Sequence, residues 1–429
     1  MSARLSGMDY KRRLIDDILD ETIPGLAAIA IEGAKAVGKT ATASRRAATV
    51  LSLNDPRQRA SVAGNYDLVT ELDIPVFIDE WQLEPQVWER VRQAVDEDPT
   101  GGRFLLAGSA GLASGVRIHS GAGRIVNLTL RPMALAERGV EHPSVSLRSL
   151  MHGGATISGS TVLATRDYVD EILRSGFPGI RDLKPEDRDR QLDGYLAHIV
   201  DRDMPDNGMM VRHPGIVRAW LRAYAAATAS TANYTKILNA ATPGQPEKPA
   251  QNTVNTYREH LRRLFVLDPV EAWAPSFSKL NSLTYTPKHH LVDPALAARL
   301  AGVGAEGLLV GGGDTITPDV GTWLGALFES LAVLSVRVYA EAMNARIGHL
   351  RTKNGDHEVD IIVEGADSRC IAIEVKLSDT IDDHDVKHLN WLGGKLGPRL
   401  VDRLVLHTGP RAYRRADGVA VVPLALMGP

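Results

Sequence analysis

Residues 31–40 read IEGAKAVGKT, and this stretch decides the expected fold. It contains the pattern G-x-x-x-x-G-K-T, which ends in Lys39 and Thr40. Such a loop turns its backbone amides toward phosphate oxygens, its lysine reaches the β- and γ-phosphates, and its hydroxyl binds Mg²⁺. The apolar run LAAIAIE precedes the motif and TATASRRAATVLSL follows it, so a strand and a helix flank the loop as the motif requires. The residues expected to bind the nucleotide are Gly33, Ala34, Lys35, Ala36, Val37, Gly38, Lys39 and Thr40.

Two acidic residues supply the second half of a nucleotide site. VFIDEWQ (76–82) has the pattern of a buried strand that ends in two carboxylates. We expect Asp79 to hold Mg²⁺ together with Thr40, and Glu80 to orient the attacking water. The alternative is a pair of solvated acids at a strand end. The position after a further strand, forty residues beyond Lys39, favours the magnesium role.

Two other residues have expected roles near the phosphates. The apolar strand FLLAGSA (104–110) brings Ser109 to a strand end, where its hydroxyl is expected to sense the γ-phosphate. GAGRI (121–125) sets Arg124 in a glycine-flanked turn. We expect Arg124 to neutralise transition-state charge, either in its own chain or from a neighbouring subunit. An ordinary surface arginine is the open alternative.

Length and composition bound the class of protein. The chain has 429 residues, of which 44% are hydrophobic and 24% are charged, which is typical of soluble multidomain chains. The net charge of −3 gives no global field for nucleic acid. A single cysteine fits a reducing compartment. The N-terminal stretch lacks the apolar segment of a signal peptide, and no long uninterrupted apolar run is present. We therefore expect a cytoplasmic protein without a membrane partner.

The pattern of apolar runs predicts an α/β fold in three parts. Short strands are expected at 26–31, 50–53, 75–78, 104–107 and 125–130, with helical stretches between them, which is typical of a parallel sheet. Residues from about 165 to 300 look mainly helical. A helix, two strands, a second helix and a further strand follow from about 320. The predicted domains are 1–140, 141–313 and 314–429.

Six segments together resemble a large prokaryotic family of AAA-type P-loop ATPases, whose C-terminal domain of unknown function is related to PD-(D/E)xK nucleases. The segments are GAKAVGKT, FIDEWQ, LLAGSA, GAGRIVNLTLRPMALAE, SGFPGI (175–180) and YLAHIVDRD (195–203). The resemblance covers most of the chain and implies that the nucleotide is ATP. This sequence has Ala34-Lys35 where the family usually has Pro-Arg. A homo-oligomer is possible if Arg124 serves a neighbouring site.

The middle region contains a stretch that resembles a helix-turn-helix with a wing. TKILNAA (235–241) is followed by a turn-rich insert and by NTVNTYREHLRRLFVLDPVEAW (252–273). Helical spacing turns residues 254, 257, 261 and 264 toward the core. Arg258, Arg262 and Arg263 then face outward, where they can contact DNA. The alternative is a helix whose charged residues serve only solvation and packing.

The C-terminal region carries a second group of acidic residues. In EVDIIVE (358–364) and CIAIEVKLS (370–378), alternation brings Asp360, Glu374 and Lys376 together if the two strands pair. Asp360 and Glu374 are expected to bind Mg²⁺ or Mn²⁺, with Lys376 positioning or deprotonating a water. The family resemblance adds Glu329 from a preceding helix. A solvated salt-bridging face is the alternative for an E-x-K pattern.

The sequence therefore predicts an ATP-hydrolysing AAA-type protein coupled to DNA handling by a nuclease-like domain. The alternative is a nucleotide-dependent regulatory protein whose C-terminal domain is a non-catalytic docking platform.

Overall fold

The computed structural model describes residues 10–108, 121–243, 250–274, 283, 286–309 and 318–429, with the side chains of 318–322 left out. The chain forms two compact units, Met1–Leu130 and Arg131–Pro429. The first boundary therefore precedes the predicted one at 140, and the predicted middle and C-terminal regions share one unit.

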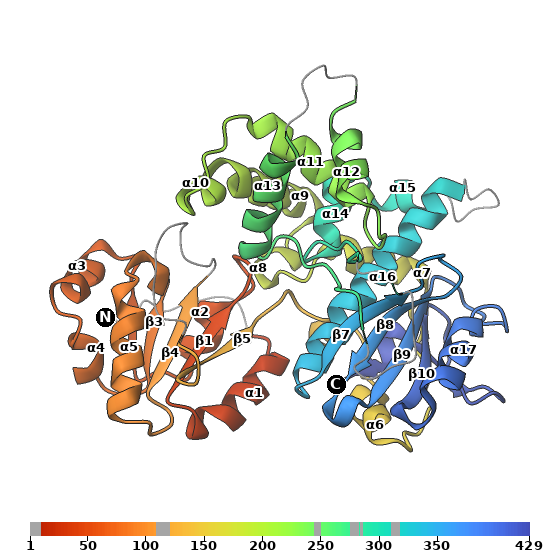
Figure 1. Ribbon diagram of the computed structural model, residues 1–429, viewed down its shortest axis with the longest axis horizontal. Helices are drawn as coiled ribbons and strands as arrows, with labels where there is room; N and C mark the ends of the chain where they lie inside the picture. The colour runs from red at the N-terminus through yellow and green to blue at the C-terminus, as the bar shows by residue number, and fades with distance from the viewer. Residues whose placement is uncertain (1–9, 109–120, 244–249, 275–282, 284–285, 310–317) are drawn as a thin grey trace. The chain divides into compact units, whose positions relative to one another are not determined.

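The first unit is built on a parallel sheet of five strands in the order β2-β3-β4-β1-β5 (Figure 1). The strands lie within two residues of their predicted positions, which confirms the parallel-sheet domain. Their bounds are β1 Ala28–Glu32, β2 Thr49–Ser52, β3 Val76–Asp79, β4 Phe104–Gly108 and β5 Ile125–Thr129. Because β4 lies between β1 and β3, the carboxyl ends of these three strands meet at one edge of the sheet.

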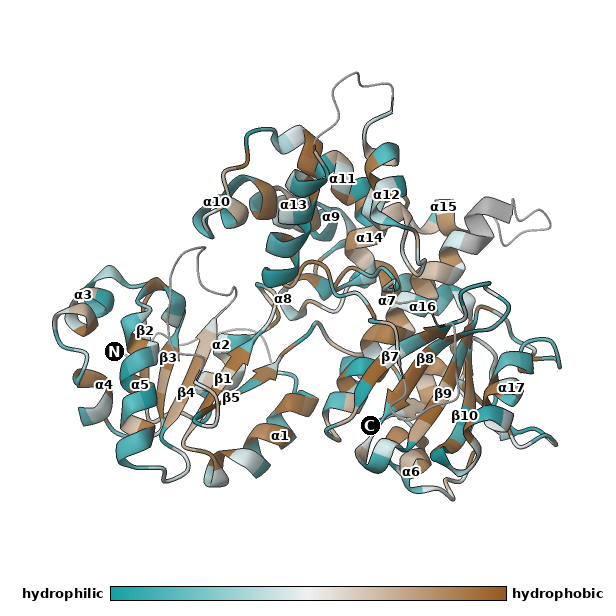
Figure 2. Cartoon of the chain, viewed as in Figure 1, coloured by the Kyte–Doolittle hydropathy of each residue, from teal (hydrophilic) through white to brown (hydrophobic). Residues whose placement is uncertain are grey.

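Apolar side chains from strands and helices form the core of this unit. The central strands β1, β3 and β4 are mainly tan to brown in Figure 2 and nearly all of their residues are buried, because both faces of a covered parallel sheet are apolar. Trp81 and Trp88 pack against each other with ring centroids 4.5 Å apart and join the core cluster beside β3 and β4. The helices are α1 Leu14–Thr22, α2 Lys39–Ser44, α3 Pro56–Gly64, α4 Leu68–Glu71 and α5 Gln86–Glu97.

The second unit begins with a largely helical region, as predicted. Its helices are α6 Leu147–His152, α7 Thr165–Arg174, α8 Pro178–Arg181, α9 Pro185–His198, α10 Met204–Asp206, α11 Pro214–Ala226, α12 Tyr234–Ala241, α13 Gln251–Arg263, α14 Pro294–Ala301 and α15 Ala305–Leu309. Arg131, its first residue, forms ion pairs with Asp268 at 2.8 Å and with Glu341 at 2.5 Å. These contacts tie the start of the unit to its helical and C-terminal parts.

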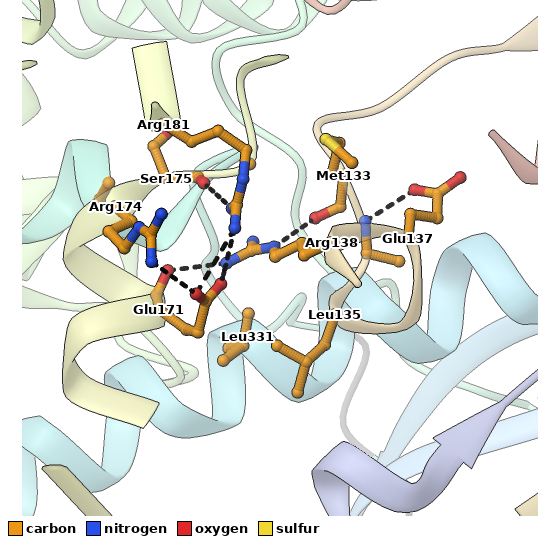
Figure 3. Close-up of polar contacts among 12 residues, drawn as sticks. Met133, Leu135, Glu137, Arg138, Glu171, Arg174, Ser175, Arg181 and Leu331 are labelled. Atoms are coloured by element: carbon orange, nitrogen blue, oxygen red, sulfur yellow. Dashed lines mark hydrogen bonds and ion pairs between the residues drawn. The ribbon is translucent and has the colours of Figure 1, made fainter. Parts of the chain in front are cut away.

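Buried ionic contacts fix the segment that follows Arg131 (Figure 3). Glu171 of α7 forms an ion pair with Arg138 at 3.1 Å and another with Arg181 of α8 at 3.3 Å. The three side chains are no more than 5% exposed. Arg181 also donates to the carbonyl oxygen of Ser175 at 2.9 Å, so the segment SGFPGI is held inside this network.

A mixed sheet of six strands completes the second unit, in the order β11-β12-β10-β9-β8-β7. β7, β8 and β9 are antiparallel neighbours, whereas β9, β10 and β12 run parallel. Helix α17 Lys387–Leu396 packs on one face of the sheet, against Ala372 and Val405 among others. The strands are β7 Arg346–Arg351, β8 Glu358–Glu364, β9 Cys370–Lys376, β10 Leu400–His407, β11 Tyr413–Arg414 and β12 Ala420–Pro423.

The long helix α16 Pro318–Glu341 contacts β7, β8 and β9 of this sheet. Its segment Trp323–Glu341 is long and apolar enough to cross a membrane, but 72% of the apolar window is buried inside the unit. The core helix of a globular domain meets the same criterion, and the burial of this segment favours a core helix.

Candidate functional site

The loop between β1 and α2 has the backbone geometry that its glycines predict. Gly38 precedes α2 with a φ of 104°, and Gly33 follows β1 with a φ of 150°. A Cβ atom on Gly33 would lie 2.1 Å from the carbonyl oxygen of Leu130, at the end of β5. Ala36 has a φ of 64°, in the left-handed region. Gly33 therefore allows the close approach of two backbones, and Gly38 allows the turn into the helix.

The ammonium group of Lys39 lies inside this loop. Its Nζ donates to the carbonyl oxygens of Gly33 and Ala34, both at 2.8 Å, and the residue is only 6% exposed. Burial lowers the pKa of Lys39 to about 8, although the charges of Glu80 and Asp79 oppose this shift. The lysine is therefore held by the loop that its motif is expected to use for phosphate.

Thr40 and Asp79 are in direct contact. The Oγ1 of Thr40, at the start of α2, donates to the two carboxylate oxygens of Asp79 at 3.0 and 3.1 Å. Asp79 ends β3 and is 7% exposed, and its burial raises the pKa of the carboxyl group. A hydroxyl and a carboxylate are the hard oxygen donors that Mg²⁺ prefers, and a nearby cation would stabilise the ionised form of a buried acid. These two residues therefore fit the predicted magnesium site.

The two residues predicted beside the γ-phosphate differ in how far the structure describes them. Glu80 directly follows β3 with a φ of 55°, and its carboxylate accepts a hydrogen bond from the amide of Gln82. That position brings Glu80 to the carboxyl ends of the strands, next to Asp79. Ser109 lies outside the described residues, although β4 ends just before it, at Gly108, between β1 and β3.

Arg124 lies at the end of the sheet where the strands begin, away from the carboxyl ends that the phosphate loop follows. It directly precedes β5, whose first residue Ile125 pairs with Ala28, the first residue of β1. The loop 33–40 instead follows the carboxyl end of β1. The guanidinium of Arg124 donates to Asp96 at 2.8 Å, and the side chain is 45% exposed. This placement does not support a role at the phosphate site of its own chain, whereas a contribution to a neighbouring subunit stays a prediction.

Three residues that the sequence analysis missed support the phosphate loop. The guanidinium of Arg13 donates to the carbonyl oxygen of Val37 at 3.2 Å. Asp16 accepts hydrogen bonds from the backbone amide of Arg13 and from the hydroxyl of Tyr10, each at 2.6 Å. Arg13 and Asp16 are buried, but they belong to no motif. Only the tertiary contact reveals their role.

The C-terminal residues predicted to act together do lie close to one another. The Nζ of Lys376 contacts Glu374 Oε1 at 2.9 Å, and Asp360 Oδ2 accepts the backbone amide of Val375 at 2.9 Å. Glu329 and Asp360 share one ionic partner, Lys288, which the sequence analysis did not identify. β8 and β9 pair as an antiparallel hairpin, as that prediction required.

Strict alternation along β8 is wrong at one point. It assigned Val359 and Ile362 to opposite faces, whereas both belong to the core cluster that includes Leu389 of α17. The pairing of β7 with β8 shifts register between Gly348 and Leu350, which is the mark of a β-bulge. An extra residue on β8 at this bulge reverses the side-chain alternation.

The ammonium of Lys288 lies at the predicted metal site of Asp360, Glu374 and Glu329. It lies 2.8 Å from Asp360, 2.9 Å from Glu329 and 3.1 Å from Glu358. Within the described part of the chain, no group of three or more His, Cys, Asp or Glu side chains could hold a metal ion. The ammonium therefore lies where a divalent cation would have to bind Asp360 and Glu329.

Ionisation in this cluster follows the position of Lys288. Burial alone would lower the pKa of Lys288, but Asp360, Glu329 and Glu358 outweigh it and hold that pKa well above its usual value. Burial, followed by repulsion from Asp360, raises the pKa values of Glu329 and Glu374 to about 8. For Asp360, burial is outweighed by Lys288, so its pKa is lowered.

The three arginines predicted to contact DNA lie on α13. Val254, Tyr257, Leu261 and Leu264 are all buried, as predicted from their spacing. The guanidinium of Arg258 lies 4.2 Å from the centroid of the Tyr234 ring, and Arg262 pairs with Glu271 at 2.6 Å. Arg263 is exposed. The arginines share one helix, but two of them are engaged within the unit.

Three family models match successive parts of the chain. Residues 27–138 match the AAA domain family. Residues 165–307 match a domain of unknown function (DUF8612), and residues 324–427 match another (DUF4143). The first match supports the predicted AAA-type P-loop domain and nucleotide binding of the ATPase kind. The nuclease-like relation of the C-terminal region stays a prediction.

Two relatives align with nearly the whole chain. The uncharacterized proteins Mb2031c of Mycobacterium bovis and Rv2008c of Mycobacterium tuberculosis are each 25% identical over 440 residues, which cover 98% of this chain and 86% of theirs. Among solved structures, the Walker-type ATPase PABY2304 of Pyrococcus abyssi is similar with a TM-score of 0.39 and 14% identity. That match covers 68% of this chain and 96% of the other.

Proposed function

We propose that this protein binds ATP with Mg²⁺ at the loop 33–40 and hydrolyses it by in-line attack of water on the γ-phosphate. The observation that carries this proposal is the contact between Thr40 and Asp79, which joins the end of the phosphate loop to the acidic end of β3. The AAA domain match over residues 27–138 supports it.

The proposed chemistry assigns one task to each residue. Lys39 exchanges its two loop carbonyls for oxygens of the β- and γ-phosphates. Thr40 and Asp79 supply oxygen ligands for Mg²⁺, and Glu80 orients the attacking water. When bound, the metal neutralises charge that develops on the phosphates. Arg124, if it contributes, serves a neighbouring subunit.

Titration calorimetry with ATP and Mg²⁺ tests the nucleotide site directly. The expected result is one binding event for the wild-type chain and none for Lys39→Ala. Lys395→Ala is the matched control because Lys395 is an exposed lysine in the C-terminal part of the second unit. A folded Lys39→Ala variant that binds ATP as the wild type does would refute the assignment.

A second proposal concerns DNA. Arg258, Arg262 and Arg263 lie on one helix whose opposite side is buried, which favours a basic contact surface on α13. If this surface binds phosphates, replacing the three arginines with alanine weakens binding to duplex DNA in a shift assay and flattens its salt dependence. Triple replacement of Arg166, Arg190 and Arg212, which are all exposed and belong to other segments, is the control.

Unchanged DNA binding by the triple variant would remove the α13 proposal. The regulatory alternative would then account for the second unit, with the C-terminal domain as a docking platform. Its test is capture of partner complexes by the immobilised protein in ATP compared with ADP, using Lys39→Ala to show that any difference depends on the nucleotide site.

A further inference from the structure

One buried ammonium group lies among three carboxylates in the second unit. We call Lys288, Glu329, Glu358 and Asp360 the carboxylate cluster. The Nζ of Lys288 is within 2.8 to 3.1 Å of one oxygen of each acid, and its side chain is 2% exposed. The acids come from two elements, α16 and β8. The lysine comes from a third segment, between α13 and α14.

The backbone of Lys288 is held in place independently of its side chain. Its amide donates to the carbonyl oxygen of Val270 at 2.8 Å, and its carbonyl oxygen accepts the amide of Val270 at 2.9 Å. This antiparallel bridge fixes the point from which the side chain enters the cluster. The position of the ammonium is therefore a property of the fold.

We propose that Lys288 is a built-in replacement for a divalent cation, so the carboxylate cluster binds no metal and the C-terminal domain does not cleave nucleic acid by metal-dependent chemistry. The inference goes beyond the proposed ATPase, because it concerns a separate site and needs no nucleotide.

The dimensions of the cluster fit an ammonium group. Oxygen ligands lie about 2.0–2.6 Å from Mg²⁺ or Ca²⁺, whereas charge-assisted N–H···O hydrogen bonds are about 2.7–2.9 Å long. The distances from Lys288 Nζ to Asp360 and Glu329 are 2.8 and 2.9 Å. A metal at the same point would require the acids to move inward after the lysine had withdrawn.

The charges around the cluster are also paired within the protein. Arg351 contacts the second carboxylate oxygen of Glu358 at 3.2 Å, and Lys376 pairs with Glu374 at 2.9 Å. Asp360 uses its second oxygen to accept the amide of Val375. Both oxygens of Asp360 and of Glu358 therefore have protein partners, whereas among the described residues Glu374 Oε2 is buried without a hydrogen bond and Glu329 Oε1 has only its ion pair with Lys288.

The experiment is a titration of nucleotide-free protein with Mn²⁺, with free Mn²⁺ measured by electron paramagnetic resonance. Four proteins are compared: wild type, Asp360→Asn, Lys288→Met, and the double variant Lys288→Met with Asp360→Asn. Methionine matches the lysine stem up to Cε and removes the charged ammonium group. All four carry Asp79→Asn, so that the phosphate site does not contribute.

We expect Asp360→Asn to leave Mn²⁺ binding unchanged when Lys288 is present. Lys288→Met is expected to gain one site, bound at least about tenfold more tightly than any site of the starting protein, a change of about 1.4 kcal/mol. The double variant is expected to lose that site. Circular dichroism verifies that each variant is folded.

Two results would overturn the proposal. One is Mn²⁺ binding by the protein with Lys288 intact that disappears in Asp360→Asn. Nicking of plasmid DNA that requires Mn²⁺ and is lost in Asp360→Asn would equally overturn the proposal. The other is a folded Lys288→Met variant that gains no site. If Lys288→Met does not fold, Mn²⁺ binding by the wild type compared with Asp360→Asn still tests the proposal. Neither measurement depends on ATP hydrolysis.

Discussion

The hydroxyl of Thr40 lies 3.0 Å from a carboxylate oxygen of Asp79, although 39 positions separate the two residues in the chain. The strand order explains the contact, because β4 lies between β1 and β3 and the ends of all three strands meet. The contact joins the phosphate loop to the acidic strand end, and the following predictions about catalysis depend on it.

Substitution of Glu80 by glutamine separates binding from turnover. Glutamine keeps the shape of the side chain but replaces the carboxylate that is proposed to orient the attacking water with a neutral amide. We expect ATP affinity to stay within about twofold and kcat to fall by about 10²–10⁴-fold. Calorimetry gives the affinity and phosphate release gives kcat. Glu71→Gln, at an exposed position on α4, is the control, and full turnover by Glu80→Gln would exclude the proposed role of Glu80 in orienting the water.

Binding of ATP is expected to take up protons at alkaline pH. Burial lowers the pKa of Lys39 to about 8 in the free protein, so a growing fraction of the lysine is neutral above that pH. Phosphate oxygens favour the charged form and raise the pKa, so the neutral fraction gains a proton on binding. Uptake is expected to be small at pH 7 and to increase above pH 8, while affinity decreases.

Calorimetry in two buffers of different ionisation enthalpy measures this proton uptake. Lys39→Arg is the control, because arginine stays charged throughout this pH range and removes the lysine contribution. Equal uptake by the wild type and by a Lys39→Arg variant that still binds ATP would assign the protons to another group.

Gly33→Ala is expected to destabilise the first unit. A Cβ atom at this position would lie 2.1 Å from the carbonyl oxygen of Leu130, so β5 and the loop would have to separate. We expect a loss of about 1–3 kcal/mol in the free energy of unfolding, as for other overpacked sites. Gly64→Ala, with nothing within 4 Å of the new Cβ, is the control and is expected to be neutral or slightly stabilising. Urea denaturation measures both variants.

Glu171→Gln tests the buried ionic network of the second unit. The substitution keeps the shape of Glu171 but leaves the charges of Arg138 and Arg181 without their carboxylate. Loss of one partner of a buried pair typically costs about 3–5 kcal/mol. Glu186→Gln, at an exposed position on α9, is expected to change stability little. Equal denaturation midpoints for the two variants would contradict the importance of the network.

The loop and the acidic strand end of the proposed phosphate site could be predicted from the sequence because each is a local feature of the chain. Gly33, Gly38, Lys39 and Thr40 belong to one short motif, and Asp79 ends an apolar run of strand length. Strands of a covered parallel sheet are apolar on both faces, so their positions were predicted to within two residues. Arg13 belongs to no such pattern, since its role depends on a tertiary contact, the hydrogen bond from its guanidinium to the carbonyl oxygen of Val37.

The C-terminal cluster shows where the sequence no longer determines the answer. The alternation of side chains along its two strands predicted that Asp360, Glu374 and Lys376 lie close together, and they do so in the structure. The bulge on β8 and the chain segment that carries Lys288 are long-range features, and no local pattern reports them. Lys288 is 72 positions from Asp360.

The sequence by itself therefore determined the phosphate loop, the acidic strand end and the apolar strands, because each depends on neighbours along the chain. The tertiary structure decided which cation balances the C-terminal acids and at which end of the sheet Arg124 lies. Those outcomes depend on how distant segments pack, and a buried charge takes whichever partner the fold brings within hydrogen-bond distance.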